Sequence, residues 1–264
     1  MSCEICALVG RVEDAAAMRA AGATRVYLDV IDVEPTDENL ASVECEGLVP
    51  VLSEVCREGD HAMLDPWVRP GQPVAVGNLS ELALAAERGA VAEVRSCVPA
   101  HNAATLGALA GLGAASVWLS PELSLEEAAE LAALSPLPLG MSAYARPRLM
   151  TCEHCALQVA YGCDRNHATC PHRARPHWLV NIDERHLPVR TDAQGRSRVY
   201  LDEPVDLTAD SARLAKAGIG RLLVDATTTS MKEAADAIAR IRGSLAGESV
   251  VFAGVRGLAD SGVE

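Results

Sequence analysis

Aromatic side chains are scarce in this sequence, which has one Phe, three Trp and four Tyr among its 264 residues. A core built around large rings is therefore excluded. Hydrophobic residues still make up 49% of the chain, so Ala, Val, Leu and Ile must fill the interior. Barrels of the α/β class commonly form one domain of roughly 200 to 250 residues. We therefore predict a single barrel-like domain over residues 1–264.

Basic residues are outnumbered, with 23 Lys and Arg against 36 Asp and Glu and a formal net charge of -13. This charge repels phosphate and disfavours non-specific binding to nucleic acid, so no DNA partner is expected. A local concentration of arginine nevertheless lies between residues 146 and 198. Four of its members are weak candidates for binding an anionic substrate or RNA phosphate: Arg146, Arg148, Arg173 and Arg175. The alternative is a solvated surface in which these arginines balance nearby acidic groups.

The sequence lacks a basic segment followed by an apolar one at its start, and its nine cysteines are an odd number. Both features argue against secretion and a disulfide framework, so we expect a cytoplasmic protein. In that compartment clustered cysteines indicate metal or redox chemistry more often than disulfides. Residues 102–121 carry no charge, but Gly111 and Gly113 interrupt their pattern. We expect a helix followed by a strand there and no membrane span.

Short apolar runs alternate with helical patterns along most of the chain, which is typical of βα units around a parallel sheet. Nine such runs are candidate strands: 5–9, 25–30, 48–52, 74–76, 92–94, 116–119, 139–142, 221–225 and 249–253. A closed eightfold barrel needs one fewer, so we expect one wrong assignment or an irregular closure. Residues 177–201 alternate apolar and polar side chains and predict antiparallel strands. The predicted fold is α/β, a TIM-like barrel with a Cys-rich segment and β-hairpin inserted at 150–201.

Polar residues follow many of the predicted strands at their carboxyl ends, where barrels of this kind carry their chemistry. They are Asp29, Ser53, Glu54, Asn78, His101, Asn102, Ser120, Glu122, Tyr144, Arg146 and Asp225. Asn102 and Glu122 are weak substrate-binding candidates. The alternative for Asn78, Asn102 and Ser120 is that each caps the next helix.

The sequence contains two similar Cys-x-x-Cys pairs, in MSCEICAL and in MTCEHCAL. Residues three apart on a strand point to opposite faces, so Cys3 and Cys6 on the first predicted strand cannot converge on one ion. We therefore expect the first pair to be structural.

The second pair, Cys152 and Cys155, is followed by Cys163 and Cys170, which places four thiols within nineteen residues. Thiolates bind zinc or iron–sulfur clusters. The irregular spacing favours an iron–sulfur cluster over structural zinc. Zinc remains an alternative, and so does a thiol-rich loop that binds no metal. His167 can replace a thiolate as ligand, in which case Cys152 is a bystander.

Several stretches resemble the peptidase U32 family, the collagenase-like proteins: VGNLSELALAAERG, VPAHNAATLGALAGLGAASVWLSPELSLEEAAEL, LMTCEHCALQ and PVRTDAQGRSRVYL. The resemblance covers most of the chain and implies a TIM-like barrel with a Cys-bearing excursion. Relatives in this family carry a 4Fe-4S cluster and act in oxygen-independent hydroxylation of ubiquinone precursors, transfer RNA or ribosomal RNA. The resemblance thus implies an iron–sulfur enzyme with a small-molecule or RNA substrate. In size the chain is similar to the ubiquinone-pathway proteins, which implies a homologous partner in a heterodimer.

On the family's pattern Cys155 matches the first ligand after a barrel strand, and Cys163 and Cys170 match later ligands. Close relatives have another Cys near position 167, where this chain has His167. The resemblance therefore leaves the fourth ligand open between Cys152 and His167. It predicts no catalytic residue.

The family name implies a second function, proteolysis by a hydrolase. That reaction needs an activated nucleophile, a metal-bound water or a pair of carboxylates. The sequence has neither a Gly-x-Ser-x-Gly nor a His-Glu-x-x-His motif, which argues against a peptidase. A third alternative is a non-catalytic, metal-binding subunit of a heteromeric complex.

Overall fold

The computed structural model describes residues 3–163 and 169–262. The chain divides into two compact units. Unit 1 comprises Met1–Ala145 and Asp206–Glu264, and unit 2 comprises Arg146–Val205.

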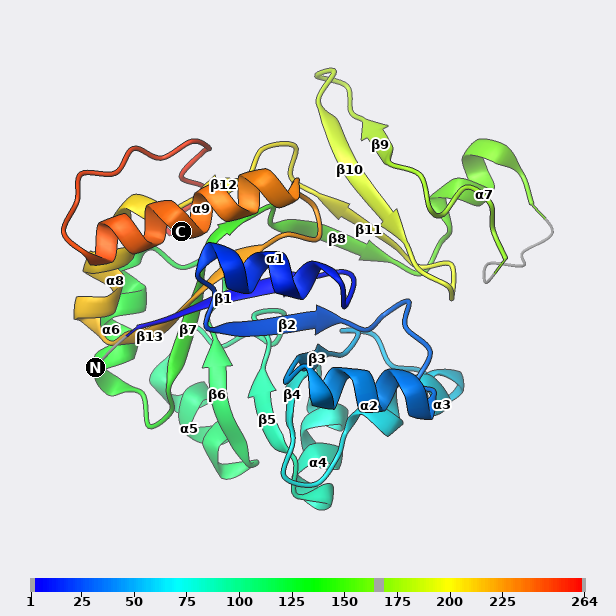
Figure 1. Ribbon diagram of the computed structural model, residues 1–264, viewed down its shortest axis with the longest axis horizontal. Helices are drawn as coiled ribbons and strands as arrows, with labels where there is room; N and C mark the ends of the chain where they lie inside the picture. Colours follow the sequence, from blue (N-terminus) through cyan, green and yellow to red (C-terminus); the bar gives the residue numbers. More distant parts are fainter. Residues whose placement is uncertain (1–2, 164–168, 263–264) are drawn as a thin grey trace. The chain divides into compact units, whose positions relative to one another are not determined.

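Unit 1 is built on a closed barrel of parallel strands (Figure 1). Its strands are β1 (Glu4–Val9), β2 (Arg25–Asp29), β3 (Val49–Val51), β4 (Pro73–Val76), β5 (Val91–Val94), β6 (Ala114–Trp118), β7 (Leu139–Ala145) and β13 (Ile219–Asp225). They pair in the order β7-β13-β1-β2-β3-β4-β5-β6, and the pairing of β6 with β7 closes the ring. The predicted TIM-like α/β barrel is confirmed.

Helices cover the outside of the barrel (Figure 1). They are α1 (Asp14–Ala21), α2 (Asp37–Cys45), α3 (His61–Leu64), α4 (Leu79–Arg88), α5 (Ala103–Gly111), α6 (Leu125–Leu134), α8 (Ser211–Ala217) and α9 (Met231–Leu245). Three single turns of 3-10 helix accompany them: η1 (Glu58–Asp60), η2 (Asp65–Trp67) and η3 (Thr208–Asp210). The uncharged stretch 102–121 divides between α5 and β6, as predicted. Within residues 3–163 and 169–262, none of the helices has the length and hydropathy of a membrane span.

Aliphatic and small side chains fill the barrel. Cys6, Tyr27, Val51 and Trp118 belong to one buried cluster in its interior. Cys6 is fully buried there, whereas Cys3 lies just before β1 and donates from its thiol to the Ile219 carbonyl at 3.5 Å. The two thiols of the first pair therefore have separate environments, as the strand argument expects.

A buried ion-pair network lies inside the amino-terminal half of the barrel. The Glu93 carboxylate pairs with Arg25 and, at 3.1 Å, with Arg221, and it accepts a hydrogen bond from the Tyr27 hydroxyl. Glu93 is 1% exposed, so two cations and a hydroxyl compensate one buried charge. Because barrel enzymes carry their chemistry at the opposite end of the strands, we assign this network to the stability of the barrel.

The predicted strand at 249–253 is wrong, because these residues form no regular structure. Eight strands already close the ring, so this apolar run has no free edge to pair with on the barrel. Val251 and Phe252 remain exposed instead. The backbone N–H of Ala253 donates to the Asp206 carboxylate at 2.6 Å.

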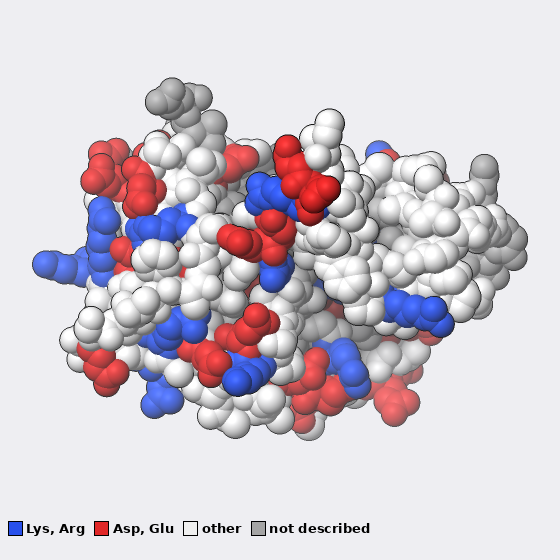
Figure 2. Space-filling model, turned by 90° about the horizontal axis from the view of Figure 1, so that it is seen from above, with Lys and Arg blue, Asp and Glu red and all other residues white. Residues whose placement is uncertain are grey.

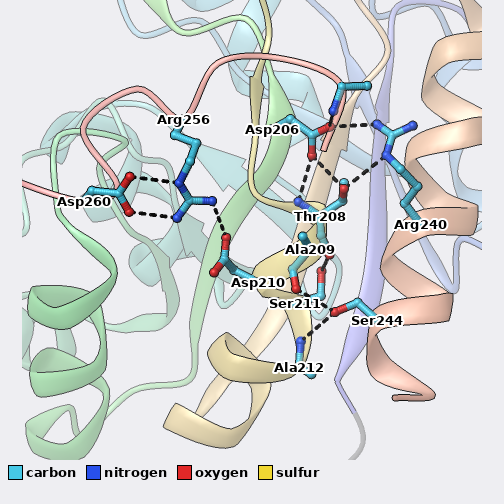
Figure 3. A network of polar contacts seen from close by, with 11 residues as sticks. Asp206, Thr208, Ala209, Asp210, Ser211, Ala212, Arg240, Ser244, Arg256 and Asp260 are labelled. Atoms are coloured by element: carbon cyan, nitrogen blue, oxygen red, sulfur yellow. Dashed lines mark hydrogen bonds and ion pairs between the residues drawn. The ribbon is translucent and has the colours of Figure 1, made fainter. Parts of the chain in front are cut away.

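The Asp206 carboxylate anchors the carboxyl-terminal part of unit 1 (Figure 3). Asp206 belongs to the two-residue strand β12 (Val205–Asp206) and is fully buried. Besides Ala253, it accepts hydrogen bonds from the N–H and hydroxyl of Thr208 and from Arg240 at 3.0 Å. With four donors on one carboxylate, this buried charge is fully compensated.

Unit 2 is a small antiparallel sheet with one short helix. Its strands are β8 (Arg148–Cys152), β9 (His177–Val180), β10 (His186–Thr191) and β11 (Ser197–Tyr200), and α7 (Ala156–Tyr161) follows β8. The strand order is β8-β11-β10-β9, which confirms the predicted antiparallel segment. Asp192, at the turn between β10 and β11, accepts from the backbone of Arg196 and pairs with Arg198 at 2.9 Å.

Candidate functional site

The thiols Cys152 and Cys155 of unit 2 both accept backbone hydrogen bonds. Cys152 ends β8, and its sulfur accepts from the His154 N–H at 3.4 Å. Cys155 is the buried N-cap of α7, and its sulfur accepts from the Gln158 N–H at 3.4 Å. Both sulfurs are therefore oriented by the backbone that surrounds them.

The other two predicted thiol ligands lie further along the same unit. Cys163 is exposed just after α7, and Cys170 is half-buried. His167 lies outside the described residues. In the ranges 3–163 and 169–262, no three Cys, His, Asp or Glu side chains are arranged to hold a metal ion. The donor types fit a soft metal, but their described arrangement is not a closed cage, so the cluster, its zinc alternative and its ligands stay predictions.

An aromatic stack connects α7 to the segment after Cys170. The Tyr161 ring lies parallel to His172 with the ring centres 4.1 Å apart, and His177 lies 5.7 Å from Tyr161. The Nε2 of His177 donates to the His172 carbonyl at 2.8 Å. These contacts hold α7 to the segment that follows Cys170, and no periodic pattern in the sequence predicts them.

The predicted anion-binding arginines have varied environments. Arg146 donates to the carbonyls of Leu201 and Asp202, so its guanidinium holds backbone within unit 2. Arg148 begins β8 and is half-buried, as is Arg173, whereas Arg175 is exposed. Figure 2 shows basic and acidic side chains intermixed on the face it draws, without a broad patch of one sign. The contacts of Arg146 with backbone carbonyls match neither predicted role, and anion binding by the four arginines stays a prediction.

At the carboxyl end of the barrel, several candidates contact groups close to them in the structure. Asn78 and Asn102 cap α4 and α5, as their alternative assignment predicts. Ser120 accepts from the Glu122 N–H at 3.2 Å and does not cap α6, whose cap is Ser124. Glu122 is exposed and lies 3.7 Å from the His101 Nε2.

A charged cluster at this end centres on Arg95, which follows β5. Its Nη1 donates to the Leu52 carbonyl and lies 3.7 Å from the Glu54 carboxylate. Burial by itself lowers the pKa of Arg95, but Cys97, Glu54 and Asp29 raise it above its ordinary value. The guanidinium therefore remains a cation in this setting.

Glu81, in the first turn of α4, is the second member of the cluster. Its Oε2 accepts from the Gly77 N–H at 2.8 Å. Its Oε1 is buried and has no hydrogen-bond partner among residues 3–163 and 169–262. Burial raises the pKa of Glu81 to about 7. The Gly77 N–H, Arg95 and Asn78 act in the opposite direction and lower this pKa, but their effect is smaller. A carboxyl group with a pKa near neutrality can exchange a proton at physiological pH.

Close backbone packing brings these groups together. A Cβ atom on Gly77 would lie 2.8 Å from the Glu54 Cα, so only glycine fits between the ends of β3 and β4. Cys97 donates from its thiol to the Gly77 carbonyl at 3.4 Å. Sequence reasoning found Glu54 but missed Glu81 and Arg95. The only signal for Glu81 was its place three residues after the cap Asn78.

Comparison with known proteins supports the fold. No protein-family model and no curated protein matches the sequence. Among solved structures, the chain is similar to one described as "Native KDPGal structure", with a TM-score of 0.52 and 11% identity over 92% of this chain and 94% of the other.

Two further solved structures have lower TM-scores. For the U32 peptidase Mk0906 the TM-score is 0.47, with 11% identity over 86% of this chain and 93% of the other. For wild-type GGGPS from Thermoplasma volcanium it is 0.45, with 8% identity over 95% of each chain. At these identities the likeness concerns the fold alone, and the fold defines an α/β-barrel protein of the TIM-like class.

Proposed function

We propose that this chain is an iron–sulfur protein of the peptidase U32 kind that acts in an oxygen-independent hydroxylation, or in a related modification of RNA or a quinone precursor. The observation that carries the proposal is the set of four thiols in unit 2, two of which already accept backbone N–H groups. Such hydrogen bonds to sulfur also tune the reduction potential of clusters. A bound cluster would supply electron transfer, and the chain's own part is to hold it and to limit its exposure.

The proposed ligands are Cys152, Cys155, Cys163 and Cys170, with His167 as the alternative to Cys152. Cys152 is favoured because thiolates bind clusters far more commonly than imidazoles. The two-residue spacing between Cys152 and Cys155 would also let one turn present both sulfurs. Metal binding would have to draw the thiols together, and such coupling of metal binding to local folding is well known for small metal-binding segments.

The test is iron and acid-labile sulfide content after purification without oxygen. Cys152→Ser should lose the cluster, and His167→Ala should retain it. Cys45→Ser is the matched control, because Cys45 is an exposed thiol of unit 1 and should leave the metal content unchanged. Full cluster in Cys152→Ser with loss in His167→Ala would move the fourth ligand to His167. Absence of sulfide from every preparation would reject the cluster and favour zinc.

A protein partner is part of this proposal. Strand β9 is an edge of the sheet in unit 2, and its Trp178, Leu179 and Val180 are 55%, 43% and 55% exposed. Exposed apolar side chains on an edge strand favour pairing with another chain. When the chain is expressed alone, we expect this surface to self-associate. Trp178→Lys combined with Val180→Lys should reduce the mass measured by analytical ultracentrifugation to that of a monomer, and a wild-type chain that is already monomeric would count against the partner.

A further inference from the structure

Ser197 is a buried residue of unit 2 that lies beside the second Cys pair but is not one of the proposed ligands. It begins β11 and pairs with Cys152 of β8, so the two side chains are neighbours on the same face of the sheet. Its Oγ accepts from the N–H of Ala156, the residue after Cys155, at 2.9 Å. Ser197 therefore holds both ends of the turn that carries the two thiols, one end through strand pairing and the other through its hydroxyl.

The hydroxyl of Ser197 is also bonded from the neighbouring strand. Ser197 is 2% exposed, and the Thr191 hydroxyl of β10 lies 3.0 Å from its Oγ. Thr191 is paired with Ser197 in the sheet, so both hydroxyls come from regular strands. A hydroxyl has one hydrogen and two acceptor positions, and here an N–H and a second hydroxyl occupy two of these three sites. The two bonds restrict the rotation of the Ser197 side chain.

The bond to Ala156 joins parts of unit 2 that are distant in sequence. Ala156 begins α7, and the first N–H groups of a helix have no acceptor within the helix itself. The Cys155 sulfur provides a local acceptor, for the Gln158 N–H. The Ser197 hydroxyl provides an acceptor from a strand 41 residues further along the chain. Unlike a local cap, this second bond attaches the start of α7, and Cys155 with it, to the strand that pairs with Cys152.

We propose that Ser197 is a positioning residue that keeps Cys152 and Cys155 in one arrangement before a soft metal ion binds. The inference rests on the proposed function, because it takes these two thiols as metal ligands. A turn that is already ordered loses less conformational entropy when the metal binds. Removal of a residue that orients metal ligands in this way typically lowers metal affinity about 10- to 100-fold. Loss of the Ser197 hydroxyl should therefore weaken binding although the hydroxyl is not itself a ligand.

The experiment titrates the full chain, reduced and free of metal, with cobalt(II) and follows the absorption of its bonds to thiolate. Cobalt(II) is a suitable probe because thiolate donors bind it as they bind zinc and iron. Ser197→Ala should bind cobalt(II) about tenfold more weakly than wild type. Thr191→Val is the matched control, because it removes the other hydroxyl of the buried pair but leaves the acceptor of the Ala156 N–H in place. Its cobalt(II) affinity should lie within about twofold of that of wild type.

A second measurement is made on the chain without metal. Cys155 is 5% exposed, so its alkylation by iodoacetamide should be slow in wild type. Ser197→Ala releases the start of α7 and should increase this rate about tenfold through local opening, whereas Thr191→Val should not. Cys163 is exposed and serves as the internal control, since its alkylation rate should be the same in all three proteins. Peptide mass spectrometry gives both rates from one sample.

The two measurements separate this inference from the proposed function. Equal cobalt(II) affinity in wild type and Ser197→Ala would overturn the positioning role, and an unchanged rate of Cys155 alkylation would do the same. Equal weakening in Ser197→Ala and Thr191→Val would also overturn it, because a general loss of stability in unit 2 would then explain both. A wild type that binds neither cobalt(II) nor iron would instead reject the proposed function, and the metal-related role of Ser197 with it.

Discussion

Replacing Glu81 by Gln should remove a pH dependence from the stability of unit 1. Burial raises the pKa of the folded-state carboxyl to about 7, from an ordinary value of 4.5. Since the folded pKa is the higher one, the stabilisation is fully present below pH 4.5 and is lost as the pH rises through 7. The difference of about 2.5 corresponds to roughly 3 kcal/mol of unfolding free energy, at about 1.36 kcal/mol per pH unit.

The glutamine keeps an oxygen that can accept from the Gly77 N–H but has no charge to bury. Its buried NH₂ group adds a constant cost of about 1–3 kcal/mol, so the change with pH, and not the absolute stability, is the informative quantity. Wild type should lose about 2.5 kcal/mol more than the variant between pH 5 and pH 8.

Urea unfolding at several pH values measures this difference. The background should be Trp178→Phe, because Trp67 and Trp118 then report on unit 1 alone by fluorescence. Glu87→Gln serves as the exposed control on the same helix. The alternative result is that the unfolding free energies of wild type and Glu81→Gln change in parallel with pH, within about 0.5 kcal/mol. That result would refute the assignment of Glu81 as a buried carboxyl with a pKa near 7.

Three further substitutions, with one control, test the barrel. Gly140→Ala should destabilise unit 1 by about 1–3 kcal/mol, because the added Cβ would lie 2.5 Å from the Trp118 ring; Gly107→Ala in the exposed face of α5, where nothing lies within 4 Å, should instead be neutral or stabilising in the same urea assay. Asp206→Asn should cost roughly 3 kcal/mol by thermal or urea unfolding, because it leaves Arg240 without its buried charge partner, and a loss below about 1 kcal/mol would show that the anchor is unimportant. Cys6→Ser should lower stability yet leave metal content unchanged, because Cys6 is fully buried in the barrel interior; loss of metal in that variant would contradict the separation of the two Cys pairs.

The sequence predicted the barrel because its signals are local. Each strand is a short apolar run, and caps such as Asn78, Asn102 and Ser124 bond backbone groups within a few residues. The run at 249–253 has the same local appearance as a strand and was wrongly assigned. Its fate depends on the closure of the ring by β6 and β7, which no local pattern records.

The charged cluster illustrates why a site is harder to predict than a fold. In the sequence, Glu81 has the position of the acidic residue in a capping box, and Arg95 is a polar residue that follows a strand. Glu81 bonds the Gly77 N–H, Gly77 packs against Glu54, and Glu54 lies beside Arg95. Packing between neighbouring strands of the barrel wall therefore brings these residues into one region. The thiol segment is the reverse case, since residue type and spacing predict its chemistry while the described geometry does not bring three ligands together.

The most direct test of the proposed function is the native mass of the full chain after purification without oxygen. We predict one added mass that corresponds to a four-iron, four-sulfide cluster per chain, which is lost on exposure to air. A stable added mass of one zinc ion, or the mass of the bare polypeptide from every anaerobic preparation, would contradict the account.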